Sequence, residues 1–120
     1  MKITEEIIKK AKEKTNTIDL LAFDYKEAND LLDNFVGYEL EGVENYDQLE
    51  ERVTEYADSL VDIYYYDIYK STSKFSEAIN QATEELGRPE TIDKEIQQGQ
   101  FYAYNNLFMS FVQNLRELDK

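Results

Sequence analysis

The sequence predicts one all-α domain over residues 1–120, a compact acidic bundle of about five helices. Only one proline and four glycines occur in 120 residues, which argues against a loop-rich or all-β fold. Apolar residues make up 42% of the chain and recur at helical spacing, so a modest core is expected. No internal repeat or linker divides the sequence.

The first two helices are predicted at residues 4–14 and 24–36. In the first, Ile7, Ile8 and Ala11 share one face. The second begins with Asp24 as N-cap, because an acceptor side chain there can bind a free backbone N–H. Gly37 is a stop signal, and residues 37–45 are therefore predicted to form a loop.

The third predicted helix begins at Asp47 and has two chemically opposite faces. At about 100° per residue, its apolar face carries Leu49, Val53, Tyr56, Leu60, Ile63 and Tyr64. The opposite face places one carboxylate on each turn, about 5–6 Å apart, at Asp47, Glu51, Glu55, Asp58 and Asp62.

Two more helices are predicted at residues 73–87 and 91–118. Gly87 followed by Pro89 is typical of a helix end. The last helix is apolar over more than one stripe, which indicates either a central core helix or a core helix that also contacts a second copy. The residues of that alternative homodimer contact are Phe101, Tyr104, Phe108 and Phe111.

Negative charge is concentrated in one block of the sequence. The net charge is -13, and residues 15–69 contain 15 acids but only Lys26 and Arg52 as bases. Such a field repels nucleic acids and membrane surfaces and attracts basic proteins. The opening segment has no apolar signal-peptide core, so a cytoplasmic protein is expected, with no membrane and no nucleic-acid partner.

Several classes of catalytic site are excluded because the residues that they require are absent. Histidine and cysteine are absent, which excludes Ser-His-Asp and Cys-His catalysis. The remaining enzymatic alternative is a magnesium-dependent nucleotide phosphohydrolase, with Glu27 and Asp30 facing Glu55 and Asp58. The last two lie opposite the apolar face, so we expect no enzyme, no cofactor and no metal.

The carboxylates themselves could imitate a polyanion. Duplex DNA carries one charge per about 1.7 Å of axis, and neighbouring helices with a carboxylate on each turn approach that density. A basic DNA-binding groove is the expected partner. The predicted acidic surface consists of Asp24, Asp30, Asp33, Glu39, Glu41, Glu44, Asp47, Glu50, Glu51, Glu55, Asp58, Asp62 and Asp67.

The segment YDQLEERVTEYADSLVDIYYYDIYKSTSKFSEA, residues 46–78, resembles the Ocr-like family of phage antirestriction proteins, which are DNA mimics. The shared features are an Asp-rich helix start, the pair Ala57-Asp58 and the run from Tyr64 to Ile68. Residues 90–108, ETIDKEIQQGQFYAYNNLF, are similar to the core helix that follows in that family. The two segments cover a little over half of the chain.

The resemblance implies an acidic helical dimer that fills the DNA groove of type I restriction-modification enzymes, with the mimic surface on residues 47–67. This chain differs in its nearly neutral C-terminus, NLRELDK, and its basic opening helix. A CRISPR effector therefore stays open as a target. The alternative function is a helical protein-interaction module that uses its C-terminal aromatic helix.

Overall fold

A computed structural model of the chain describes residues 2–17, 20–62 and 68–120. The described residues form six helices and no strand, which confirms the predicted all-α fold. The helices are α1 (Glu5–Thr15), α2 (Tyr25–Glu39), α3 (Tyr46–Leu60), α4 (Ile68–Lys74), α5 (Ser76–Leu86) and α6 (Ile92–Leu118). None of these helices is both long enough and apolar enough to cross a membrane.

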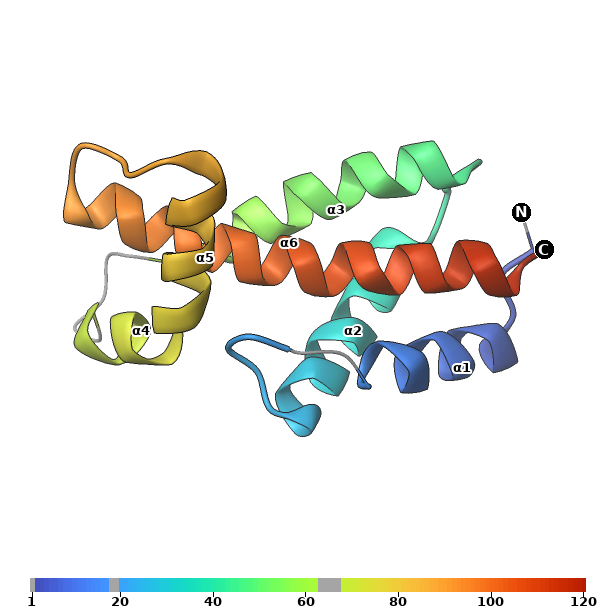
Figure 1. Cartoon of the computed structure of the whole chain (residues 1–120). Coiled ribbons are helices and arrows are strands. Elements are labelled where there is room, and N and C mark those ends of the chain that lie inside the picture. The colour runs from blue at the N-terminus through green and yellow to red at the C-terminus, as the bar shows by residue number, and fades with distance from the viewer. Residues whose placement is uncertain (1, 18–19, 63–67) are drawn as a thin grey trace.

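Helix α6 is the central element of the bundle. It packs against α1, α3 and α5, and Figure 1 shows α1 and α3 on opposite sides of it while α5 runs across its first half. Contact on several sides explains its wide apolar surface, with Phe108, Phe111 and Leu115 completely buried. At about 1.5 Å per residue, its 27 residues span most of the 43 Å length of the molecule.

Helices α5 and α6 approach each other closely at Gly99. A Cβ atom at this position would lie 2.2 Å from Ile79 Cγ1 and 2.7 Å from Ile79 Cα. Only a residue without a side chain fits there, so this glycine sets the crossing of the two helices.

Helix α2 does not stop at Gly37, contrary to the prediction. It continues to Glu39, because nothing in the backbone at Gly37 requires a positive φ and the end of the helix is held from outside. Arg52 Nη1 donates to the carbonyl oxygens of Glu39 (2.9 Å) and Glu41 (2.7 Å). The arginine thus satisfies carbonyls that have no partner within the helix.

Helix α3 is shorter than the sequence pattern indicated. It ends at Leu60, and Val61 is extended, so Asp62 is not on the helical face predicted for it. Asp62 is instead hydrogen-bonded to the side chain of Gln100 in α6.

A separate helix, α4, was not predicted, and Phe75 separates it from α5. Ile63, Tyr64 and Asp67 lie outside the described residues.

Candidate functional site: an acidic surface on α2 and α3

Helix α3 presents carboxylates to solvent because its opposite face is apolar and packs in the core. Asn45 caps the helix, accepting from Gln48 N at 2.8 Å. Leu49, Val53 and Ala57 are completely buried. The carboxylates of the opposite face are all exposed, as predicted: Asp47, Glu51, Glu55 and Asp58.

Arg116 of α6 partly offsets the negative charge at the start of α3. Its Nη2 atom lies 3.3 Å from Asp47 Oδ1 and 3.3 Å from Glu50 Oε1. These two carboxylates therefore contribute less to the outward field than the sequence indicates. The pairing was missed because Arg116 is distant in sequence from both.

Three carboxylates of α3 stay open to solvent, and we call Glu51, Glu55 and Asp58 the α3 row. Within the described ranges, none of the three carboxylates forms an ion pair or accepts a hydrogen bond. Their spacings of four and three residues bring like charges to neighbouring turns, which is unfavourable for an isolated helix. No ion pair in the described ranges offsets this repulsion.

The acids of α2 have mixed roles. Asp24 accepts from Glu27 N at 2.8 Å and so serves as the N-cap. Asp33 is ion-paired with Lys12 of α1. Asp30 is exposed and has no ion-pair partner among the residues described.

The remaining predicted acids follow the second helix. Glu39 is half-buried, whereas Glu41 and Glu44 are exposed in the connection to α3. The two helices are neighbours, because the Phe35 ring of α2 lies 5.6 Å from the Tyr56 ring of α3. The acidic residues of α2, of the connection and of α3 thus belong to one helical hairpin.

Tyrosine side chains at the edge of the core do not add negative charge at neutral pH. Burial raises the pKa of Tyr56, and the neighbouring Tyr38 and Glu39 raise it further. Burial likewise raises the pKa of Tyr104, with smaller contributions from Glu27 and Asp62. These phenols stay protonated, and the negative field comes from carboxylates alone.

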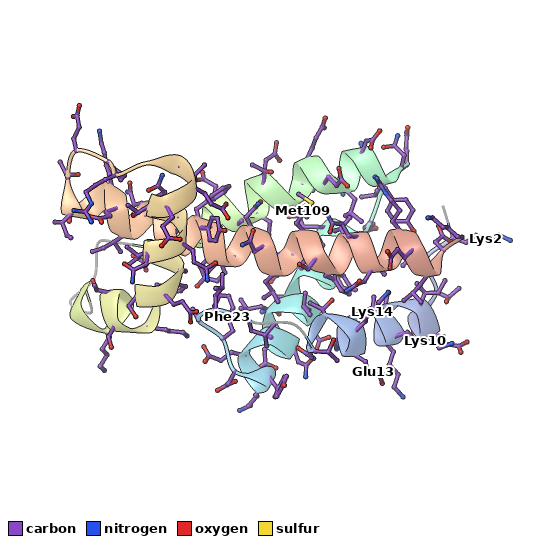
Figure 2. The ribbon with its side chains drawn as sticks, in the orientation of Figure 1. Lys2, Lys10, Glu13, Lys14, Phe23 and Met109 are labelled. Atoms are coloured by element: carbon purple, nitrogen blue, oxygen red, sulfur yellow. The ribbon has the colours of Figure 1, made fainter. Side chains whose placement is uncertain are left out.

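Lysine side chains of α1 lie on the other side of the molecule. Lys10, Glu13 and Lys14 are labelled on α1 in Figure 2, across α6 from α3. Lys10 pairs with Glu6 at 3.2 Å and Lys14 with Glu117 at 2.6 Å, and the latter contact lowers the pKa of Glu117. The basic opening helix therefore leaves the α3 row unneutralised.

The four carboxylates considered for magnesium do not form a site. Glu27 is ion-paired with Lys74, and Glu55 and Asp58 point to solvent from α3. Over the part of the chain that the structure describes, no group of three or more Asp or Glu residues could hold a metal ion.

The predicted dimer contact on α6 needs correction. Phe108 and Phe111 have no exposed surface within the single chain, and the two rings pack on Phe35 at 5.1 and 6.2 Å. They are core residues and cannot meet a partner in this fold. Phe101 and Tyr104 are only partly exposed.

Comparison with known proteins adds no functional assignment. No protein-family model, no curated protein and no solved structure matches the chain.

Proposed function

We propose that the protein is a non-enzymatic inhibitor that imitates DNA and occupies the DNA-binding groove of a host defence enzyme. A type I restriction-modification enzyme is the first target to test and a CRISPR effector the second. The inhibitor would be phage-encoded and would act in the cytoplasm of the host cell. The observation that carries the proposal is the α3 row, three exposed carboxylates that form no ion pair within the described residues.

Charge density supports a partial imitation of the duplex. A net charge of -13 over a length of 43 Å is about one charge per 3.3 Å. A duplex of that length carries about 25 phosphates, at one per about 1.7 Å, so the protein reaches roughly half of that density. Because residues 15–69 contain 15 acids but only Lys26 and Arg52 as bases, the density on the α2–α3 hairpin exceeds this average.

Rigidity also favours the proposal. The carboxylates of the α3 row stand on a helix whose core side is fully buried, so they are presented without a folding step on binding. A preorganised charged surface spends less conformational entropy on association than a flexible acidic tail. The alternative interaction module loses its main support, because Phe108 and Phe111 are buried.

The direct test is displacement of a labelled duplex from a purified type I restriction-modification enzyme, with a CRISPR effector assayed in parallel. The proposal predicts displacement at near-equimolar protein. It also predicts that affinity falls as salt rises, with a smaller slope than DNA shows for the same target, because fewer counterions are released. If neither enzyme releases its DNA, these targets are excluded and the mimic proposal loses its basis.

A further inference from the structure

A pocket opens beside the last residue of the α3 row, where the end of α3 meets the first turns of α6. Its volume is about 420 Å³. This lies within the range of small-ligand sites. The lining combines one acid, one base, two amides and two apolar side chains: Asp58, Lys94, Gln97, Gln98, Val61 and Phe101.

The wall of this pocket is held in place by hydrogen bonds. Gln100 Oε1 accepts from Asp62 N at 2.8 Å, and Gln100 Nε2 donates to the Asp62 carbonyl at 3.1 Å. Val61 N donates to the Asp58 carbonyl at 3.2 Å. The turn that carries Asp58 and Val61 is thereby tied to α6, and the two sides of the pocket keep a fixed separation.

One acceptor in the lining has no partner. Gln98 Oε1 is buried, and no donor in the described part of the chain reaches it. A buried acceptor without a hydrogen bond is costly, so a ligand that supplies an N–H group there gains more than it would from an already satisfied oxygen.

We propose that this pocket receives an arginine side chain of the basic partner, an identification that rests on the proposed function. The guanidinium group has five N–H donors in a planar arrangement, which can bind the Asp58 carboxylate. Gln98 Oε1 is buried, so it can accept from the guanidinium only when the Gln98 amide rotates toward the pocket. The flat face of the guanidinium can stack on the Phe101 ring, and Val61 covers the aliphatic stem.

Lysine fits the same pocket less well. Its ammonium group is a compact, strongly hydrated charge without a planar face, so it can bind Asp58 but cannot stack on Phe101 in the same way. The Lys94 side chain is exposed and repels either cation. An anionic ligand is disfavoured, because the pocket adjoins the α3 row in a chain of net charge -13.

The test is an NMR titration of the folded protein with N-acetyl-arginine amide, and with N-acetyl-lysine amide as its match. The arginine probe is expected to shift the signals of Val61, Phe101 and the Gln98 side-chain amide, and to bind about fivefold more tightly than the lysine probe. Equal shifts with both probes, or shifts spread evenly over α2 and α3, would overturn the inference.

Two matched substitutions separate a pocket from a diffuse field. Asp58→Asn and Glu51→Gln each remove one exposed charge from the α3 row, but only Asp58 lines the pocket. Asp58→Asn should weaken arginine binding about fivefold and Glu51→Gln less than about twofold. Equal losses would show that only the field matters.

Two further variants test the separate contributions of Phe101 and Lys94 to binding. Phe101→Leu keeps an apolar wall but removes the aromatic face, so it should abolish the preference for arginine over lysine. Lys94→Gln should tighten binding of both probes. A preference that survives Phe101→Leu contradicts the proposed stacking.

The outcomes also separate this inference from the proposed function. If the protein displaces DNA from its target but binds arginine no better than lysine, the pocket proposal fails while the mimic proposal stands. If arginine binds in the pocket and no DNA-binding enzyme is inhibited, the mimic proposal fails and the pocket is confirmed as a guanidinium site.

Discussion

The side chain of Gln100 makes two hydrogen bonds to the backbone of Asp62, accepting at 2.8 Å and donating at 3.1 Å. Gln100 is 3% exposed, whereas Asp62 is exposed, so the two bonds are shielded from water on the Gln100 side. They join the residues that follow α3 to the first half of the central helix, and they hold the C-terminal end of α3 in place.

Replacing Gln100 should therefore destabilise the protein. Gln100→Ala leaves a backbone N–H and C=O of Asp62 without their partners, and we expect a loss of about 2 kcal/mol in the free energy of unfolding. Urea denaturation followed by circular dichroism measures it. Gln100→Glu should recover little of this lost free energy, because a carboxylate cannot donate a hydrogen bond to the Asp62 carbonyl. An unchanged free energy in Gln100→Ala would mean that the contact is not formed in solution.

Two glycine-to-alanine substitutions should have opposite signs. Gly99→Ala forces a Cβ atom into Ile79 and should cost about 1–3 kcal/mol, despite the better helix propensity of alanine. Gly37→Ala lies inside α2 with no atom within 4 Å of the new Cβ, so it should stabilise by about 0.5–1 kcal/mol. Thermal denaturation of both variants compares them. Destabilisation by Gly37→Ala would contradict the helical conformation at that position.

Removing charge from the α3 row should raise stability. Glu55 lies between Glu51 and Asp58 on neighbouring turns, so Glu55→Gln should stabilise by about 0.2–0.5 kcal/mol at low salt, and the gain should shrink as salt screens the repulsion. Asp47→Asn is the matched control. It should give no such gain, because Asp47 pairs with Arg116 and lies in the first turn of α3. Equal stabilisation by Glu55→Gln and Asp47→Asn would show that the ion pair with Arg116 makes no difference to the cost of a carboxylate on α3.

Tyr46 should contribute to alkaline unfolding. Burial and the hydrogen bond from its hydroxyl to Asp119 Oδ2 (2.8 Å) raise its pKa. The group resists ionisation only in the folded state, so its contribution is complete below the unfolded pKa of about 10 and is lost as the pH rises above it.

Tyr46→Phe should accordingly reduce the loss of stability that occurs as the pH rises above about 10. It should also cost about 1 kcal/mol at pH 7, because the hydrogen bond is removed. Urea denaturation at several pH values measures both effects. If the variant and the unmodified protein show the same pH dependence, Tyr46 does not contribute to alkaline unfolding.

Periodicity alone could predict much of the fold. The core faces of α1 and α3 follow from residues repeated at helical spacing, and the N-cap at Asp24 is where the sequence indicates it. The length of α2 could not be predicted in this way. Its last turn depends on Arg52, a tertiary partner that no local pattern around Gly37 reveals.

The candidate site was predictable only in part. Alternation of apolar and acidic residues is enough to expose Glu51 and Glu55. The same pattern cannot show that Asp47 is ion-paired with Arg116, because that contact depends on how α3 packs on α6. Lys94 and Gln98 carried no signal in the sequence, since a pocket exists only once two helices meet.

The most direct test of the account is the DNA-displacement assay repeated with a charge-reversed pair. Glu51→Lys combined with Glu55→Lys changes the α3 row, whereas Glu84→Lys combined with Glu90→Lys makes the same change in net charge at exposed acids outside the hairpin. If the α3 row is the contact surface, the first variant should lose at least about tenfold in affinity for the target. The control should lose less than about threefold, because salt screening confines the effect of a charge to its neighbourhood. Equal losses, or full inhibition by the first variant with its fold intact, would contradict the claim that the α3 row is the surface that replaces DNA.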